Sequence, residues 1–348
     1  MTLVLVLAAV LWGVGWVMKT PLKTRCAMIA LLLGAVIALH LVLPDGHPIR
    51  ESTGGTAIVW VLVIVVGFVI FGYSHLLSAL RTKANETSPP SGETTKHSGP
   101  FSDTELERYA RHIVLREIGG AGQKALKDAS VLVVGAGGLG APALQYLAAA
   151  GVGTIGVIDD DIVDNSNLQR QVIHTDPRIG MHKVDSATTA IKDLNPFVTV
   201  KPYNRRLTAD IAADLIADYD LILDGCDNFD TRYLVNATCV ATQTPLIAAA
   251  LTQWEGQISL YDPNAGTPCY QCIFPQAPAA ELVPSCAEGG VLGPLPGVIG
   301  AMMAVEAVKA ITGAGEGLRG RMLIYDALYA ETRIISVKRK EGCPICGG

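Results

Sequence analysis

The chain has 348 residues, 50% of them hydrophobic, and a formal net charge of −5 at pH 7. Its mean hydropathy of +0.36 excludes an ordinary soluble protein, and the apolar excess lies in the first 80 residues. The rest of the chain is acidic and has no long run of basic residues, which makes nucleic-acid binding a poor hypothesis.

Three apolar runs in residues 1–80 predict membrane-spanning helices. They cover residues 3–18, 26–43 and 57–80, and the first is short for the ~20 residues that a span usually needs. A secretory signal peptide is the alternative for the first run, but that run lacks a basic start and two further spans follow it. Basic residues cluster between the first two runs and after the third, so the positive-inside rule places the rest of the chain in the cytoplasm. The sequence therefore predicts a multi-pass protein of the cytoplasmic membrane.

Residues 81–100 join this membrane segment to the rest of the chain. They are rich in Ser, Thr, Pro, Gly, Lys and Glu and offer almost nothing to bury, which predicts a flexible linker. The remaining residues, 101–348, are enough for one large α/β domain.

A glycine turn between two predicted strands is the first sign of a binding site. Residues 131–134 predict a buried strand, Gly135 to Gly140 form the pattern G-x-G-x-x-G, and residues 154–158 predict the second strand. Such a turn lets backbone N–H groups at the start of a helix approach phosphate oxygens, and Asp159 after the second strand can accept hydrogen bonds from ribose hydroxyls. The pattern predicts a Rossmann-like nucleotide-binding domain, for which NAD is the most frequent ligand.

Polar residues after the turn favour a nucleoside triphosphate over NAD. Arg170 offers a planar fork and Lys183 a mobile point charge for phosphate oxygens, although each alone could be a solvated surface charge. Asp227 follows a predicted strand over residues 221–224, at the sheet edge where ligands bind, and a carboxylate there suits Mg²⁺. Asn228 could orient phosphate or adenine, and either residue could instead cap the following helix. The sequence contains no G-x-x-x-x-G-K-[ST] pattern, so this is not a P-loop enzyme.

Four of the eight cysteines form two C-x-x-C pairs, Cys269 with Cys272 and Cys343 with Cys346. Two such pairs are the ligand set of a structural tetrahedral zinc, and metal is preferred over disulfides in a reducing cytoplasm. A redox-active C-x-x-C pair is the alternative. Cys286 lies in a segment rich in Gly and Pro, where it is either a nucleophile or an unreactive loop cysteine.

Several motifs in chain order give residues 101–348 a family resemblance. They are Arg108-Tyr109-Ala110-Arg111-His112, Gly135-Ala136-Gly137-Gly138-Leu139-Gly140, Ser166-Asn167-Leu168-Gln169-Arg170-Gln171, Asp227-Asn228 and the two C-x-x-C pairs. With these motifs the chain closely resembles the bacterial adenylyltransferases of molybdopterin synthase and of the thiamine sulfur carrier, which are prokaryotic relatives of ubiquitin-activating enzymes. The membrane segment lies outside the resemblance and departs from the usual soluble form of the family.

The resemblance implies an α/β fold, a Rossmann-like adenylation domain with a mixed sheet and a structural zinc. It implies that the protein uses ATP and Mg²⁺ to adenylate the C-terminal glycine carboxylate of a small ubiquitin-like sulfur carrier that ends in Gly-Gly, releasing pyrophosphate. The ATP-binding positions that it implies are Gly138, Asp159, Ser166, Asn167, Leu168, Gln169, Arg170, Lys183, Asp227 and Asn228, and the implied zinc ligands are Cys269, Cys272, Cys343 and Cys346.

The resemblance also implies roles that involve other proteins. Arg111 matches an arginine that reaches into the partner subunit's site, which implies a homodimer. Cys286 matches a cysteine that in some members links covalently to the carrier or to a sulfur donor. No sulfurtransferase domain follows Cys346, so we expect the sulfur to come from a separate sulfurtransferase or cysteine desulfurase. The implied catalytic residues are Asp227, Arg111, Arg170, Lys183 and Cys286.

The sequence is compatible with several functions. The molybdopterin type is favoured over the thiamine type because the run of motifs in this chain looks closest to that of the molybdopterin type. A tRNA threonylcarbamoyladenosine dehydratase also adenylates a carboxylate, but that branch generally lacks the zinc cysteines, and the acidic domain disfavours tRNA. An NAD-dependent redox enzyme and a non-catalytic membrane adaptor are two further hypotheses. The adaptor is disfavoured by the presence of Asp227, Arg170, Lys183 and Arg111.

Overall fold

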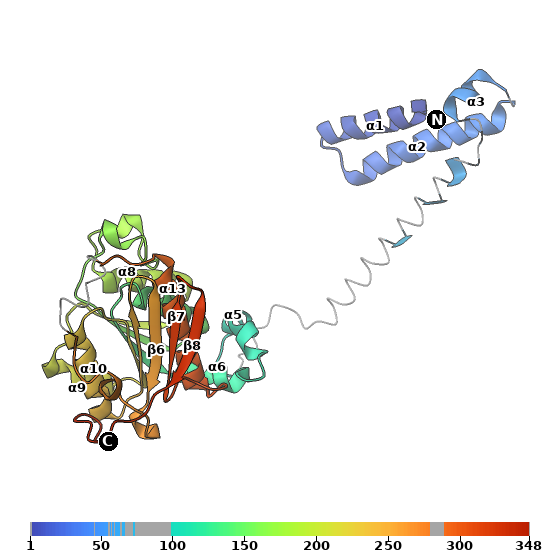
Figure 1. Cartoon of the computed structure of the whole chain (residues 1–348). Helices are drawn as coiled ribbons and strands as arrows, with labels where there is room; N and C mark the ends of the chain where they lie inside the picture. Colours follow the sequence, from blue (N-terminus) through green and yellow to red (C-terminus); the bar gives the residue numbers. More distant parts are fainter. Residues whose placement is uncertain are drawn as a thin grey trace. The chain divides into compact units, whose positions relative to one another are not determined.

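In the computed structural model the described residues are 2–44, 46–54, single stretches within 56–73, 99–278 and 289–347. The chain divides into two compact units, Met1–Lys96 and His97–Gly348 (Figure 1). The first unit is helical over most of its described residues, and the second is an α/β unit built on one sheet.

The first unit begins with two apolar helices, α1 (Thr2–Val17) and α2 (Leu22–Val42), followed by the short helix α3 (Pro48–Thr53). A small polar cluster joins the last turn of α2 to α3. His40 Nε2 lies 2.9 Å from Thr53 Oγ1, and Trp60 Nε1 donates to the Thr53 carbonyl at 2.9 Å. Many apolar side chains of α1 and α2 are exposed, and so large an apolar surface suits contact with lipid or with another protein.

Only one of the three predicted spans corresponds to a described helix of sufficient length. That helix covers Thr24–Val42 within α2, whereas α1 is apolar but has only 16 residues. The third predicted span, residues 57–80, lies mostly outside the described residues. In the described part of the chain, the other helix of this length and composition is Pro294–Thr312, which packs its apolar side chains into the core of the second unit. The described helices therefore give two candidates by length and composition, not the three spans predicted.

The second unit contains a sheet of eight described strands. They are β1 (Ser130–Val134), β2 (Thr154–Ile158), β3 (Thr199–Tyr203), β4 (Leu221–Asp224), β5 (Leu246–Leu251), β6 (Glu255–Tyr261), β7 (Arg321–Asp326) and β8 (Glu331–Ser336). Their order in space is β3-β2-β1-β4-β5-β6-β7-β8. The first five in this order pair parallel, whereas β6, β7 and β8 pair antiparallel and lie side by side in Figure 1. This mixed sheet confirms the predicted Rossmann-like α/β fold.

Helices cover both faces of the sheet. They are α5 (Asp103–Ile113), α6 (Gly119–Asp128), α7 (Gly140–Ala150), α8 (Lys183–Leu194), α9 (Ala209–Ala217), α10 (Phe229–Thr242), α11 (Tyr270–Ile273) and α13 (Pro294–Thr312). Successive side chains of β1 point to opposite faces, so Val131 and Val133 join one hydrophobic core while Leu132 and Val134 join the other. Helices α7, α8 and α13 fill the first core, and α9 and α10 fill the second. β1 is therefore buried on both faces, as its unbroken apolar sequence predicts.

The glycine turn that connects β1 to α7 is tightly packed at both ends. Gly135 has φ +94°, in the left-handed region that glycine enters at little steric cost. A Cβ built at Gly140 would lie 1.9 Å from the carbonyl oxygen of Gly135. The last residue of the turn must therefore be glycine if α7 is to begin directly beyond the end of β1.

Gly140→Ala should lower the free energy of unfolding by about 2 kcal/mol or more, because the new methyl group must displace the Gly135 backbone. Gly120→Ala in α6 is the matched control. No atom lies within 4 Å of a Cβ built at Gly120, so this variant should keep or slightly raise the free energy of unfolding. Urea unfolding of both variants beside the unsubstituted protein measures the two changes. Equal stability of the two variants would contradict the close approach at Gly140.

Candidate functional site

The carboxyl ends of β1, β2 and β4 bring the predicted nucleotide-binding residues to one edge of the sheet. The backbone after β4 lies against the glycine turn. Gly225 N–H donates to the Val134 carbonyl at 2.9 Å, and a Cβ at Gly135 would lie 3.1 Å from the Gly225 oxygen. The segment that contains Asp227 therefore meets the turn through its backbone, at the edge where ligands bind in parallel sheets.

Asp159 connects the end of β2 to the glycine turn. Its carboxylate accepts hydrogen bonds from the backbone N–H of Ala136 at 2.8 Å and of Asp161 at 2.9 Å. Burial raises the pKa of Asp159, while Lys183 and these two hydrogen bonds act in the opposite direction. Lys183 is itself buried, and its Nζ lies 2.6 Å from Asp161 Oδ2. Asp159 thus accepts a hydrogen bond from the backbone of the turn, and its contact with a ribose stays a prediction.

The predicted segment Ser166 to Arg170 lies beside the glycine turn. Arg170 Cγ is 4.0 Å from the position of a Cβ at Gly138, and Arg170 Nη1 donates to the Ser166 carbonyl at 3.1 Å. The other side of the segment faces α13, since a Cβ at Gly293 would lie 2.6 Å from Gln169 Oε1. The aliphatic part of the Arg170 side chain therefore lies next to the turn, where phosphate oxygens would bind. The remaining predicted members, Asn167 and Leu168, are half-buried at the end of the 3-10 turn η1 (Asn165–Asn167).

Asp227 and Asn228 have different environments although they are adjacent. Asn228 Oδ1 accepts a hydrogen bond from the Thr231 N–H at 2.9 Å and caps α10, which confirms the capping interpretation for this residue. Asp227 is exposed and makes no hydrogen bond or ion pair with any residue that the structure describes. Its carboxylate oxygens are the ligand type that Mg²⁺ prefers, so Asp227 fits the predicted metal role.

Sequence reasoning missed a buried ion pair beneath the Asp227 loop. Asp224 Oδ2 lies 3.3 Å from Arg232 Nη1, and the two side chains are 0% and 6% exposed. Both residues also bind the backbone of Cys226, whose N–H donates to Asp224 Oδ1 at 3.0 Å and whose carbonyl accepts from Arg232 Nη2 at 2.7 Å. Burial acts to lower the pKa of Arg232, but Asp224 raises it and the net shift is upward. One sequence feature could have predicted this pair: the otherwise apolar strand β4 ends in an aspartate. A charge buried at that position needs a partner.

His174 is a second residue that sequence reasoning missed. Its Nε2 lies 2.9 Å from the Ala136 carbonyl oxygen, and its Nδ1 lies 2.9 Å from Ser186 Oγ. With the proton on Nε2 the ring donates to the turn, so Ala136 is bonded through its carbonyl as well as through its N–H. No local pattern in the sequence marks this contact, since Ala136 and His174 are 38 positions apart.

The four paired cysteines form a compact cluster. Their Sγ atoms all lie within 4.8 Å of one another, with Cys269–Cys272 at 3.8 Å, Cys269–Cys343 at 3.7 Å and Cys272–Cys346 at 3.4 Å. A tetrahedral zinc with Zn–S bonds of ~2.3 Å places its sulfur atoms ~3.8 Å apart, so the cluster fits the predicted metal.

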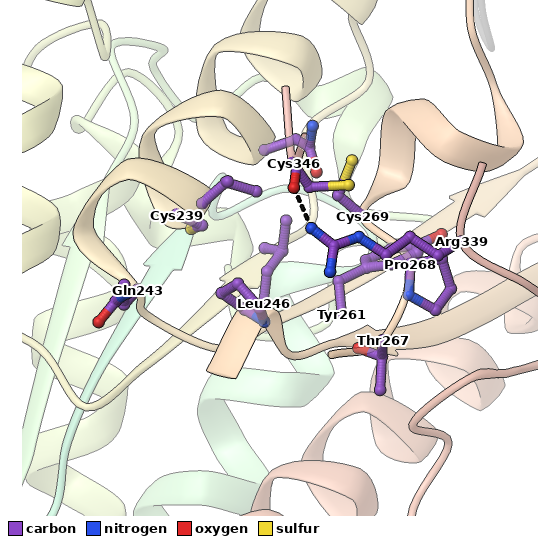
Figure 2. Close-up of a pocket in the computed structure, with 12 residues that line it drawn as sticks. Cys239, Gln243, Leu246, Tyr261, Thr267, Pro268, Cys269, Arg339 and Cys346 are labelled. Atoms are coloured by element: carbon purple, nitrogen blue, oxygen red, sulfur yellow. Dashed lines mark hydrogen bonds between the residues drawn. The ribbon is translucent and has the colours of Figure 1, made fainter. Parts of the chain in front are cut away.

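A pocket of about 190 Å³ lies beside this cluster (Figure 2). Arg339, which lines the pocket with Cys269 and Tyr261, donates a hydrogen bond to the main-chain carbonyl of Cys346. Four thiolates around one Zn²⁺ leave a net negative charge, and a guanidinium at this position suits it.

Arg111 is a predicted site residue that the structure places away from the glycine turn of its own chain. Arg111 is exposed in the last turn of α5, next to His112, whose Nδ1 lies 3.2 Å from Gln123 Oε1. Gln123 Nε2 in turn donates to the carbonyl of Ala150 at 2.8 Å, at the end of α7 that is remote from the turn. At ~1.5 Å per residue, α7 separates its two ends by roughly 16 Å. Cys286 lies outside the described residues.

The second unit matches a known protein family. A family model described as the ThiF family covers residues 109–345. The chain belongs to the ThiF family. Members of this family are adenylyltransferases related to ubiquitin-activating enzymes, so the predicted enzyme class is confirmed. Use of ATP is supported by the family, against the NAD alternative.

Three similar proteins illustrate the ThiF family. A sulfur carrier protein adenylyltransferase from Thermus thermophilus is 48% identical over 251 residues, which cover 71% of this chain and 93% of the relative. A SAMP-activating enzyme E1 from Haloferax volcanii is 46% identical over 244 residues, 70% of this chain and 90% of the relative. Among solved structures, E. coli MccB with MccA-N7isoASN has a TM-score of 0.61 and 25% identity, over 69% of this chain and 75% of that one.

The buried His174 should make the stability of the fold depend on pH. Burial is the main cause that lowers the pKa of His174, whereas in the unfolded chain the group titrates near ~6.5. The unfolded state therefore binds more protons below about pH 6.5, so the free energy of unfolding is highest above that pH and falls as the pH drops toward the lowered pKa.

His174→Gln should make this decline between about pH 7 and pH 5 shallower, because the variant removes the titrating group. Urea unfolding at several pH values measures the slope. Ile173→Val is the matched control, since it trims a buried neighbour and should lower the free energy of unfolding equally at every pH. A slope that is unchanged in His174→Gln would contradict the assignment.

Cys343→Ser should remove bound zinc and lower the melting temperature by about 10 °C, because a structural zinc contributes its binding free energy to folding. Elemental analysis of the purified protein should find one zinc per chain before the substitution. Cys239→Ala is the control: this cysteine is buried outside the cluster and its loss should leave the zinc content unchanged. Full zinc retention in Cys343→Ser would refute the four-cysteine ligand set.

Proposed function

We propose that this chain uses ATP to adenylate the C-terminal glycine carboxylate of a small ubiquitin-like sulfur carrier, releasing pyrophosphate and activating the carrier for sulfur transfer. The proposal extends to this chain what the names of its relatives say of them, a sulfur carrier protein adenylyltransferase and a SAMP-activating enzyme. Two contacts in this ThiF fold support it: Arg170 lies next to Gly138 of the glycine turn, and Asp227 comes two residues after Gly225, whose backbone contacts the turn.

The chemistry needs positive charge around the α-phosphate. A carboxylate oxygen of the carrier attacks the α-phosphorus, the bond from that phosphorus to the bridging oxygen breaks, and pyrophosphate leaves with the electron pair. Arg170, which lies next to the turn, and Lys183, which pairs with Asp161 in the segment after β2, would stabilise the negative charge on the phosphate oxygens. Asp227 would hold Mg²⁺, which neutralises phosphate charge when bound. The product is the acyl-adenylate of the carrier, which a sulfur nucleophile can attack.

We assign Arg111 to the site of a second subunit. Its position beside the far end of α7 keeps it away from the turn of its own chain, and its side chain is exposed. A homodimer that places α5 of one subunit over the nucleotide site of the other would use this exposed cation. The proposal thus includes a homodimer as the active form.

The sulfur donor in this proposal is a separate sulfurtransferase or cysteine desulfurase. Cys286 is the cysteine assigned to any covalent link with the carrier or the donor. The molybdopterin type of carrier is favoured over the thiamine type on the run of sequence motifs. A tRNA threonylcarbamoyladenosine dehydratase activity is disfavoured because the chain contains the four-cysteine cluster and an acidic second unit.

We also propose that the protein is attached to the cytoplasmic membrane with its second unit in the cytoplasm. The apolar helix Thr24–Val42 and the basic residues before it, Lys19 and Lys23 among them, support this orientation. A cytoplasmic location also gives the enzyme access to ATP.

Exchange of radiolabelled pyrophosphate into ATP, measured on the full chain in detergent with candidate carriers that end in Gly-Gly, tests the function. Exchange that depends on a carrier, and that is lost when the carrier lacks its terminal glycine, is the expected result. Comparison of molybdopterin-type and thiamine-type carriers then identifies the substrate. A zinc-loaded protein that shows no exchange with any carrier would overturn the proposal.

Asp227→Ala should reduce carrier-dependent exchange by about 100-fold or more, because it removes the proposed Mg²⁺ ligand. Zinc content and unfolding should stay unchanged, since the side chain is exposed and lies outside the cysteine cluster. Asp230→Ala, an exposed aspartate three positions along the chain, is the matched control and should keep the exchange rate. Near-normal exchange in Asp227→Ala would exclude the metal assignment.

A further inference from the structure

A buried chain of contacts runs from the four-cysteine cluster to the loop that contains Asp227. At the loop end, Cys226 is bonded through both of its backbone groups, to Asp224 Oδ1 at 3.0 Å and to Arg232 Nη2 at 2.7 Å. Gly225, the preceding residue, meets the glycine turn. The peptide on the amino side of Asp227 is therefore fixed between a buried ion pair and the glycine turn.

Arg232 is the centre of this chain of contacts. Its guanidinium is paired with Asp224 at 3.3 Å, donates to the Cys226 carbonyl, and stacks over the Tyr270 ring with 5.6 Å between Cζ and the ring centroid. The residue is 5% exposed, so all three contacts lie away from solvent.

Tyr270 ties Arg232 to the cysteine cluster. It lies between Cys269 and Cys272 in the chain, and its N–H donates to Asn236 Oδ1 at 2.8 Å on α10. Its ring is packed against three other aromatic rings, with centroid distances of 4.8 to 6.0 Å. The packed ring therefore connects the C-x-x-C segment to α10 and β6.

We propose that Arg232 is a positioning residue for adenylation, which holds the Asp227 loop in register with the glycine turn and couples that loop, through Tyr270, to the segment of the zinc cysteines. This inference rests on the proposed function, because it concerns how Asp227 is placed for that reaction. The geometry requires arginine: one planar guanidinium reaches a carboxylate, a carbonyl and a ring face together, whereas the compact ammonium of lysine cannot.

Arg232→Lys tests the proposal because it keeps the charge opposite Asp224 and removes the fork. Arg319→Lys is the matched control, since Arg319 Nε pairs with Asp262 Oδ2 at 2.8 Å, at the end of the sheet opposite the turn. In the full chain, kcat for carrier-dependent exchange should fall about 10- to 100-fold in Arg232→Lys, because a displaced catalytic group loses rate steeply. The KM for ATP should change far less, and Arg319→Lys should change neither constant.

Hydrogen exchange measured by mass spectrometry gives a readout that does not depend on activity. The backbone amides of residues 225–228 should exchange about tenfold faster in Arg232→Lys than in the unsubstituted protein or in Arg319→Lys. The peptide over residues 269–273 should also lose protection, because the Tyr270 ring loses its contact with the planar guanidinium. Zinc content should stay the same in all three proteins.

Unchanged hydrogen exchange in residues 225–228, or an unchanged kcat, would overturn the positioning role. Loss of protection throughout the second unit would also overturn it, since the pair would then be a general stability element. If the unsubstituted protein shows no pyrophosphate exchange with any carrier, the proposed function fails, while the hydrogen-exchange comparison still decides whether Arg232 fixes the loop.

Discussion

The close approach of the Gly135 carbonyl oxygen to the backbone at Gly140 is the constraint on which the site depends. It allows α7 to begin directly beyond β1, with the unsatisfied N–H groups of its first turn at the carboxyl end of the sheet, an arrangement that suits a phosphate. Asp159 and His174 then bond the N–H and the carbonyl of Ala136 from opposite sides. A turn fixed in this way has little freedom to lose when a nucleotide binds, and preorganisation of this kind favours transition-state stabilisation.

The ion pair between Lys183 and Asp161, in the segment after β2, is only partly removed from water. Burying an ion pair removes two groups from water, and their attraction repays that cost only in part. Lys183 is buried while its partner Asp161 is exposed, with 66% of its side chain accessible. Its attraction to Lys183 is therefore screened by solvent, and phosphate oxygens can compete for the same ammonium. Asp227 lies at the same sheet edge as an exposed carboxylate, which is available to a cation that accompanies the phosphates.

The sequence predicted those features of the fold and site that depend on short patterns. The apolar strand β1, the glycine turn and the cysteine spacings are local signals, and each corresponds to the expected element or cluster. The Asp224–Arg232 pair and the contact from His174 to Ala136 depend on side-chain directions and on contacts between distant segments, which residue spacing does not encode. The two roles of Asn228 could not be separated either, because a cap and a ligand contact use the same amide.

The position of Arg111 could not be predicted from the sequence either. Only the packing of α5 shows which end of the sheet the motif Arg108 to His112 occupies. In the first unit, hydropathy predicted α1 and α2 correctly as helices. It did not predict their lengths, and only α2 is long enough to span a membrane.

The cysteine cluster is connected to the nucleotide site by the segment that it closes. Cys269 and Cys343 are 74 positions apart, and the chain between them contains α13, β7 and β8. A crosslink over so long a segment removes much of the freedom of the unfolded chain. Within that segment α13 covers the turn, since a Cβ at Gly138 would lie 3.1 Å from Pro296. A metal bound to the four cysteines would therefore restrain the helix that packs against the glycine turn, in addition to the path through Tyr270.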